Sequence, residues 1–554
     1  MKKLILLVAV CLCSVVILAE NVTQERAQQI GLAFLSSMVH SVNQPMQVQT
    51  NITTGTTNLS ANGLSNLYLV NSAAGWVILS NDTRVQPILA YSATSNKLNI
   101  DNIPEGLMEL LSSYDEDIRY VKSNIPDSIE NSQWHQLATE FMSTSTTNRK
   151  VLERCTQVLW NQNENNDRSC TPSYNMLCPT FYTPRCGHTY VGCTAVAMAQ
   201  IMWYYKWPYS AVVPDSISMD GTPSEECHFQ LYDWDLMPPT LRYNTPNNEA
   251  KMITTLLRDC GYAAKMKYRA EGSSASLENA MNALSHTFGY KGQEMSHKQR
   301  STYVKSNWIQ KLKNEIDANR PVLYAAWQNS DSGHSFVIDG YEGDMFHINW
   351  GWADALSNNA FYSLNSLLPK TDEGKTGALA YNDYHEAVFG IAPFITNSMT
   401  STGTQNFGPL VRAVCSGILL EEYIVPAPYD AYFYSNTQVR ITDGCWFKAG
   451  SKVHIAIKDL PCGDYSSTQN TPAVHKSPSI ENEEDTTGDS GSDITNQIQT
   501  STIIDHIAVY SISGQLLHTI YGADTNLSSL PSGFYVLQKH MTDGSVVSET
   551  IVKN

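Results

Sequence analysis

The stretch GCTAVAMAQIM, residues 192–202, is the part of this chain that best indicates its fold. Gly192 and Cys193 precede small and apolar residues at helical spacing, which predicts a helix that begins at the cysteine. The first turn of a helix carries partial positive charge and free N–H groups, and both favour a thiolate over a thiol. Because the thiolate is the nucleophilic form, Cys193 is a candidate catalytic residue. The alternative is a buried cysteine that packs as a small hydrophobic side chain.

A candidate base for this thiol lies in GHSFVIDGY, residues 333–341, where a glycine turn leads into a strand-like apolar run. A second strand-like segment, FHINWGW, follows at residues 346–352 and contains Asn349. Thiol catalysis needs a base that takes the proton and a third polar group that orients the base. His334 and Asn349 supply these two residue types, in the chain order Cys, His, Asn.

Three other histidines compete with His334 for the role of base. His188 lies five residues before Cys193 and is expected in a loop. His347 alternates with Asn349 and would share its face of a strand, and His385 lacks the second histidine of a zinc-protease helix. None of the three has a sequence context as favourable as that of His334.

Five ordered segments resemble the streptopain family of papain-like cysteine peptidases. They are VLWNQ (158–162), YNMLCP (174–179), VGCTAVAMAQIMWYYKWP (191–208), GHSFVIDGY (333–341) and FHINWGW (346–352). The resemblance implies that Gln162 contributes to the oxyanion hole, that Cys193 is the nucleophile and that His334 is the general base. It places the Asn349-Trp350 pair beside that base.

The same resemblance implies a substrate groove, and a hydrophobic substrate side chain two positions before the scissile bond. Ser273, Gly333 and Trp352 are the expected substrate-binding residues. Ser273 belongs to YRAEGSSAS, residues 268–276, which resembles a family segment that lines the groove. The chain departs from the family after Trp352, where Ala353-Asp354 replaces the usual Gly-Gly pair.

The expected fold class is α+β. Residues 150–393 are predicted to form a papain-like catalytic domain of two parts, because helix signals come first and strand signals follow. In that layout Cys193 begins the central helix of one part, His334 and Asn349 come from the sheet of the other, and substrate binds between them. An α+β prodomain is expected before this domain and β modules after it.

The N-terminal region, residues 20–149, combines an amphipathic helix at residues 25–38 with short strands. It resembles the prodomain of the same family and is expected to inhibit the enzyme until a cut near Arg149-Lys150. A folded cover over a reactive thiol would also protect the cell that makes it. The alternative is an N-terminal interaction domain.

The composition restricts where the chain acts. A formal charge of −17 argues against nucleic acid or an anionic membrane surface as a partner. Residues 1–19 are predicted to be a signal peptide, and no later window is apolar enough to span a bilayer. The protein is therefore expected to be secreted or cell-surface, by way of the periplasm, without membrane insertion.

Export makes disulfides possible. Of the 12 cysteines, removal of Cys11 and Cys13 with the signal peptide leaves ten. One or two loop disulfides are expected among Cys155, Cys170, Cys178 and Cys186, with Cys193 left free, and the sequence leaves the pairing open. The spacing fits no short paired-cysteine zinc pattern, so we expect no metal and no cofactor.

Three regions follow the predicted catalytic domain. Residues 394–465 are predicted to form a β module, and residues 466–500 an acidic, disordered linker. Residues 501–554 are β-rich and resemble the sorting domains read by the type IX secretion system, in VYSISGQLL (509–517), LPSGFYVL (530–537) and IVKN (551–554). The alternative for the last region is a β-sandwich adhesion module.

Together these observations predict a secreted cysteine endopeptidase made as a zymogen. Its expected partners are protein or peptide substrates and the type IX secretion machinery. Two alternatives remain open at this stage. One is a surface binding or adhesion protein on a peptidase scaffold, and the other is acyl transfer such as transglutamination.

Overall fold

The computed structural model of the chain is described in several stretches. They are residues 21–41, 55–94, 97–126, 131–134, 137, 148–181, 186–269, 272–291, 294–303, 305–329, 332–352, 358–364, 385–405, 409–462, 504–511, 516–521, 533–541 and 546–553. The predicted signal peptide, the predicted linker and the Ala353-Asp354 pair lie outside them. The chain divides into two compact units, with the main boundary between Pro393 and Phe394. The predicted α+β class is confirmed.

One sheet of 11 strands runs through the first unit, in the order β1-β2-β3-β4-β12-β11-β10-β9-β13-β8, with β5 paired to β10 off this path. Its strands are β1 (Gly55–Asn58), β2 (Leu67–Ser72), β3 (Gly75–Ser80), β4 (Ile88–Ser92), β5 (Arg149–Val151), β8 (Ser296–Gln299), β9 (Val322–Asn329), β10 (Ser332–Glu342), β11 (Met345–Asn349), β12 (Ala360–Ser363) and β13 (His385–Phe389). Strands β1 to β4 belong to residues 21–126, which we call the N-terminal segment. The other strands belong to residues 148–393, the central segment.

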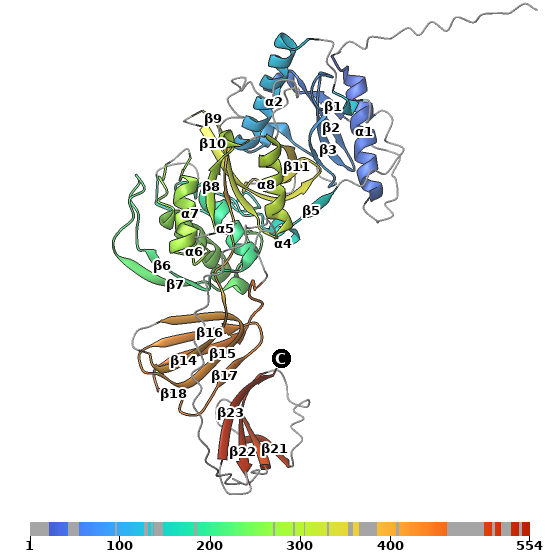
Figure 1. The fold of residues 1–554 in the computed structure, drawn as a ribbon. Coiled ribbons are helices and arrows are strands. Elements are labelled where there is room, and N and C mark those ends of the chain that lie inside the picture. The colour runs from blue at the N-terminus through green and yellow to red at the C-terminus, as the bar shows by residue number, and fades with distance from the viewer. Residues whose placement is uncertain are drawn as a thin grey trace, which may run out of the picture. The chain divides into compact units, whose positions relative to one another are not determined.

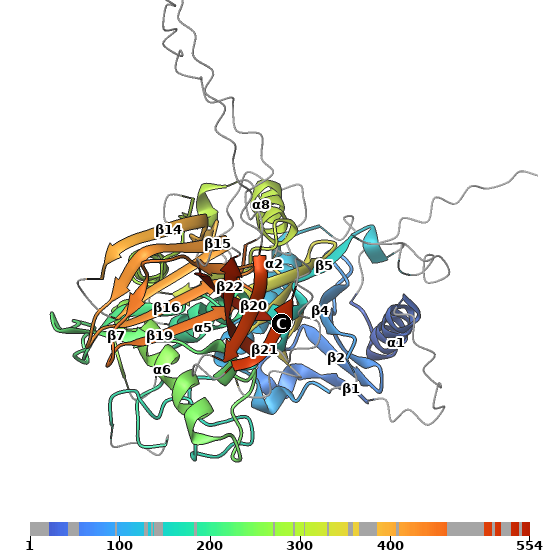
Figure 2. The same cartoon turned by 90° about the horizontal axis from the view of Figure 1, so that it is seen from below.

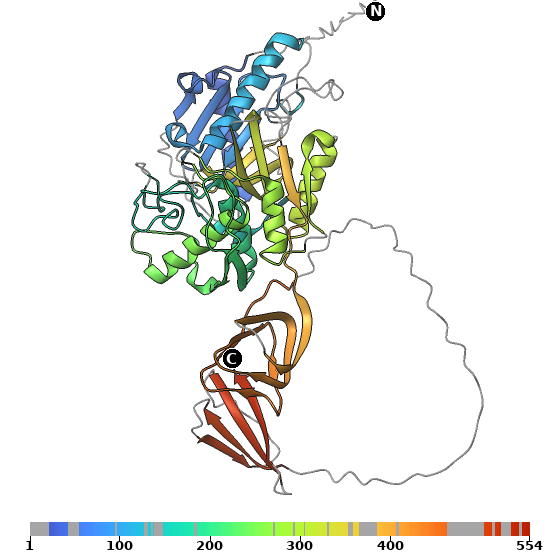
Figure 3. The same ribbon diagram turned by 90° about the vertical axis from the view of Figure 1, so that its left-hand side faces the viewer.

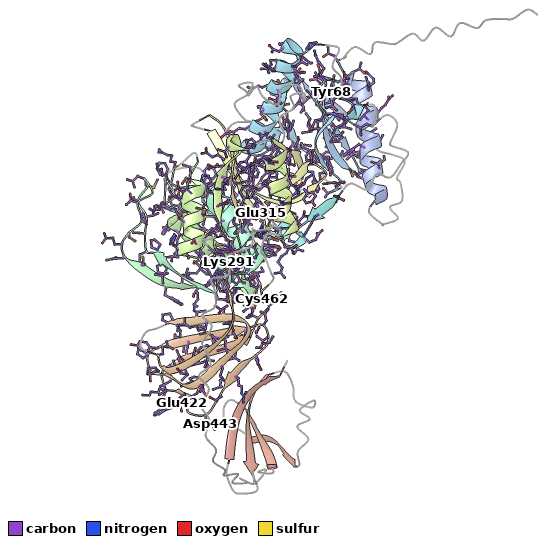
Figure 4. All side chains as sticks on the ribbon, in the orientation of Figure 1. Tyr68, Lys291, Glu315, Glu422, Asp443 and Cys462 are labelled. Carbon is purple, nitrogen blue, oxygen red and sulfur yellow. A yellow bond between two sulfur atoms is a disulfide. The ribbon has the colours of Figure 1, made fainter. Side chains whose placement is uncertain are left out.

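The N-terminal segment contains two helices in addition to its strands. Helix α1 (Gln24–Ser41) lies along β2 and β3 (Figure 2), and helix α2 (Glu105–Asn124) contacts β9 and β10 of the central segment. Tyr68 on β2, labelled in Figure 4, donates its hydroxyl hydrogen bond to the Val22 carbonyl. The apolar core under α1 includes Phe34, Tyr91 and, from β12, Phe361. The two segments therefore share both a sheet and a core.

The central segment is built around helix α5 (Cys193–Tyr205). Its small and apolar residues make the helix hydrophobic all round, and nearly all of them are buried, as expected for an internal helix. It packs against β10, α6 and α7 (Figure 1). The other elements are α4 (Glu153–Gln157), β6 (Ser210–Pro214), β7 (Cys227–Leu231), α6 (Asn247–Ala263), α7 (Leu277–His286) and α8 (Lys305–Asp317). Glu315 on α8, labelled in Figure 4, forms a buried ion pair with Arg320, which lies just before β9 in the sequence.

The second unit begins with a parallel β-coil, a solenoid-like arrangement in which strands of successive turns pair side by side, rather than with a set of hairpins. Its strands are β14 (Thr396–Thr404), β15 (Leu410–Val425), β16 (Asp430–Ser435), β17 (Val439–Ile441), β18 (Trp446–Phe447) and β19 (Lys452–Ile457), and every pair among them is parallel (Figure 3). Thr396 pairs with Val414, Leu410 with Ala431, and Asp430 with Lys452, so each partner lies one turn of the coil further along the chain. Each turn therefore stacks on the preceding one. Cys415 and Cys462 form a disulfide within it (Figure 4).

Four further strands of the second unit form an antiparallel sheet in the order β21-β20-β22-β23. They are β20 (Ile504–Ser511), β21 (Leu516–Tyr521), β22 (Gly533–Met541) and β23 (Val546–Lys553). Within the described residues of the whole chain, no helix has the length and apolar character needed to cross a membrane.

Candidate active site

Cys193 occupies the first position of helix α5, as the sequence predicts. The preceding Gly192 has a φ of +93°, and a Cβ there would lie 2.6 Å from the sulfur of Met266. A side chain at residue 192 would therefore be strained in both backbone and packing, so glycine is required there. The turn presents the half-buried Cys193 thiol at the helix N-terminus.

The Cys193 sulfur lies beside strand β10, which carries His334 and Ser335. The Ser335 N–H donates to Sγ over 3.3 Å. Burial alone would raise the pKa of the Cys193 thiol, but the attraction of His334 and the hydrogen bond from Ser335 outweigh it and lower the pKa to about 7. Burial opposes a charged imidazole as well, yet the nearby Cys193 thiolate raises the pKa of His334 above its ordinary value. The pair thus favours thiolate and imidazolium together.

The group that orients the His334 ring is a backbone carbonyl. Nε2 of His334 donates to the Trp350 carbonyl over 2.8 Å. Asn349 was expected in this role, but its amide nitrogen donates to the Val158 carbonyl (2.8 Å) and its oxygen accepts from the Gly351 N–H (3.2 Å). Asn349 therefore holds the turn that carries the orienting carbonyl.

Gln162 lies next to the segment that leads to Cys193. Its carbonyl accepts from the N–H of Val191, two residues before Cys193, over 3.0 Å. Its own N–H donates to the Asn161 side chain over 2.5 Å, and the residue is 5% exposed. The main chain of Gln162 thus lies beside the segment that leads to Cys193, and a role of its side-chain amide in an oxyanion hole stays a prediction.

Aromatic rings surround the imidazole. The Trp350 ring is buried with its centroid 5.9 Å from that of His334. Trp352 contacts His334 edge-on at 6.2 Å and stacks with Tyr190 at 6.3 Å. Apolar rings of this kind lower the local dielectric constant, which strengthens the attraction between a thiolate and an imidazolium.

The other two expected groove residues have different surroundings. Ser273 is buried, and its hydroxyl donates to the Tyr190 carbonyl over 2.8 Å. Its hydroxyl thus supports the main chain under the ring that stacks on Trp352. Gly333 is exposed near the start of β10, directly before His334.

The three competing histidines all have partners away from Cys193. His188 bonds to the Cys178 carbonyl, His347 to the Asp339 carboxylate and His385 to the Tyr324 hydroxyl. Of these four histidines, His334 is the one that the structure places beside the Cys193 thiol, and its role as the base stays a prediction.

Three polar residues of this site were not predicted from the sequence. The hydroxyls of Thr194 and Ser335 lie 3.0 Å apart, and Thr194 also donates to the Ala275 carbonyl, which ties the start of α5 to β10. Gln200, inside α5, bonds to Asn349 over 3.1 Å. The available signal was a polar residue within an otherwise apolar run, which usually marks a buried hydrogen bond.

Cys170 and Cys186 form a disulfide, whereas Cys155 and Cys178 are free and buried. One of the expected loop disulfides is thus present, with Cys193 left free. Glu164 lies close to the two bonded sulfurs. Because those sulfurs are bonded to each other, this donor set does not fit a zinc ion.

Comparison with known proteins identifies the domain that contains this site. Residues 167–362 match the model of the Peptidase C10 family. The chain contains a Peptidase C10 domain. Residues 19–118 match the Spi protease inhibitor model, so the N-terminal segment is inhibitor-like. The chain is thus a cysteine peptidase, with the C10 domain in its central segment.

Two relatives in sequence agree with this assignment. Streptopain of Streptococcus pyogenes is 29% identical over 350 residues, which cover 59% of this chain and 81% of streptopain. The thiol protease/hemagglutinin PrtT of Porphyromonas gingivalis is 29% identical over 325 residues, covering 58% of this chain and 36% of PrtT. Among solved structures, a prointerpain A fragment of Prevotella intermedia is 22% identical, with a TM-score of 0.43, and the match covers 58% of this chain and 94% of that fragment.

Proposed function

We propose that the chain is a secreted cysteine endopeptidase that is made as a zymogen and acts through an acyl-enzyme. The observation that carries this proposal is the Cys193 thiol at the first position of α5, beside His334 and hydrogen-bonded by the Ser335 N–H. The test is hydrolysis of casein by the processed chain and its loss in Cys193→Ala. Transfer of the acyl group to an added amine in place of water would instead favour the acyl-transfer alternative.

In the first step, the Cys193 thiolate attacks the peptide carbonyl carbon and forms a C–S bond. The carbonyl oxygen becomes an oxyanion, which the Gln162 amide and the Cys193 N–H stabilise. The C–N bond then breaks, and His334 gives its proton to the leaving amine. In the second step water gives a proton to His334 and attacks the thioester, which releases the acid and the thiolate.

The zymogen proposal is supported by the contact of the N-terminal segment with His334. Gly106, in the first turn of α2, lies so close to the imidazole that a Cβ there would be 2.5 Å from Cβ of His334 and 2.7 Å from its Cγ. Elsewhere in this segment, Tyr91 donates to Glu342 over 2.8 Å and Tyr114 donates to the Ser363 carbonyl over 2.6 Å. In this role the N-terminal segment is a prodomain that covers the catalytic base.

Replacement of Gly106 by alanine is expected to weaken this inhibition. The added methyl group must displace either α2 or His334, and overpacking of this kind costs about 1–3 kcal/mol. The hold of the N-terminal segment on the C10 domain should fall by about 5- to 150-fold. Precursor conversion, followed by gel electrophoresis, should accelerate accordingly.

The matched control is Ser123→Ala, an exposed change in the last turn of α2 that is distant in sequence from Gly106. This variant should convert at the wild-type rate. Equal conversion of Gly106→Ala and wild type would show that the contact with His334 does not contribute to inhibition.

We further propose that residues 501–554 act as a type IX sorting domain and that the protein reaches the medium or cell surface through the periplasm. The support is the resemblance in the three segments quoted above, whose described residues belong to one four-stranded sheet. Deletion of the chain from Ser501 to Asn554 should trap active enzyme in the periplasm, as measured by fractionation of the host. If secretion continues and only surface binding is lost, the sheet is an adhesion module.

A further inference from the structure

Gln200 is a buried amide on the nucleophile helix that the proposed mechanism does not use. It lies two turns after Cys193 and is fully buried. Its Nε2 donates to the Asn349 side-chain oxygen over 3.1 Å and to the Trp160 carbonyl over 3.3 Å. Both hydrogens of this amide are therefore directed at specific acceptors, and both acceptors lie near the catalytic groups.

Asn349 connects Gln200 to the turn whose carbonyl is bonded to His334. Its oxygen accepts from Gln200 and from the Gly351 N–H, and its nitrogen donates to the Val158 carbonyl. The turn formed by Asn349, Trp350 and Gly351 sits directly on α5, because a Cβ on Gly351 would lie 2.9 Å from the Val196 side chain. The carbonyl in the middle of this turn is the one that accepts from His334.

The same amide also holds the segment that precedes the oxyanion residue. Trp160, whose carbonyl accepts from Gln200, stands two residues before Gln162, and Val158, whose carbonyl accepts from Asn349, stands four before it. Gln200 and Asn349 thus join the nucleophile helix, the segment leading to Gln162 and the turn beneath His334. Each of these hydrogen bonds is buried, where an unmatched partner is costly.

We propose that Gln200 is a positioning residue for the catalytic base, which fixes the Asn349 amide and, through it, the Trp350 carbonyl that holds His334. Gln200 contacts neither substrate nor the reacting atoms, so its effect passes through Asn349. This inference rests on the proposed peptidase mechanism, in which His334 and Cys193 act as a pair.

The test uses Gln200→Met, which keeps the length of the side chain and removes both donors. Cys193 in the processed chain is alkylated with iodoacetamide at a series of pH values, and modification is followed by mass spectrometry. In the wild type the rate should rise with pH through about 7, because the lowered thiol pKa exposes thiolate from that pH upward. In Gln200→Met the imidazole is held less firmly, so the attraction between the thiolate and the imidazolium is weaker. The midpoint of the rise in alkylation rate should therefore move to higher pH.

Loss of one buried hydrogen-bonded contact should also lower kcat roughly tenfold with little change in KM.

The matched control is Thr254→Val on α6, which removes a buried hydroxyl bonded only within its own helix, to Ala250 and Lys251. It should reduce thermal stability without moving the alkylation midpoint. In the double variant Gln200→Met/Asn349→Ala, kcat should be no lower than in Asn349→Ala alone, because the first residue acts through the second.

Three results would overturn the inference. They are an unshifted alkylation midpoint in Gln200→Met, a shift equal to that of Thr254→Val, and multiplicative losses in the double variant. Should Gln200→Met fail to fold by circular dichroism, Asn349→Ala alone must show the upward shift, and an unshifted midpoint there also overturns the inference. Alkylation needs no peptide hydrolysis, so failure of the proposed function is distinguished from failure of this inference.

Discussion

Replacement of Cys193 by alanine is expected to abolish casein hydrolysis and to leave the chain as an uncut precursor. In the proposed mechanism the thiolate forms the acyl-enzyme, so its removal should cost on the order of 10⁶-fold in kcat. Casein hydrolysis measures the first effect, and gel electrophoresis of the purified protein measures the second. The exposed free thiol Cys227 provides the control, since Cys227→Ala should process and hydrolyse normally.

Two outcomes would contradict this expectation. Maturation of the purified alanine variant would show that an external protease makes the cut, and a folded, processed wild type without activity would refute endopeptidase function. N-terminal sequencing of the product locates the cut. Arg149-Lys150 lies in β5, paired with Glu342 and Tyr341 of β10. Because peptidases bind extended, unpaired segments, a cut at Arg149-Lys150 would require β5 to leave β10 first.

Gln162→Ala is expected to lower kcat by about 100- to 1000-fold, the size found when one oxyanion donor is removed. The amide bonds to negative charge that exists only in the transition state, so KM should hardly change. The measurement is steady-state hydrolysis of a peptide substrate. Gln230→Ala on β7 is the control, since that amide donates to the Leu231 carbonyl rather than to a residue of the site. A loss confined to KM would show that Gln162 only positions substrate.

The positions of Cys193 at a helix start and of His334 on a strand could be predicted because both residues lie in a readable local sequence pattern. The helix that starts at Cys193 follows from a small and apolar run, and His334 follows from a glycine at a strand start. The orienting group could not be predicted, since it is the carbonyl of Trp350, and any residue type carries a carbonyl. The role of Gln200 could not be predicted, because a single polar residue does not interrupt a helical sequence pattern.

The β-coil shows a second limit. Its strand signals are readable from the sequence. The parallel pairing of the strands is not, because it rests on backbone registers between successive turns of the coil that no repeated motif marks. The Cys170–Cys186 disulfide was one of several pairings that the spacing allowed. Both features depend on which segments meet in space, and local propensity does not specify that.

The sheet that joins the N-terminal and central segments affects the order in which parts of the chain fold. Ala90 on β4 pairs with Tyr362 on β12, although most of the first unit separates the two residues in the sequence. Contacts between residues so distant in sequence form slowly, because the entropy of closing the loop is lost before pairing returns any free energy. The pairing of β4 with β12, inside the sheet, is therefore formed late, after synthesis has passed β12. A chain cut between the segments before that step could form the 11-stranded sheet only by association of two separate fragments.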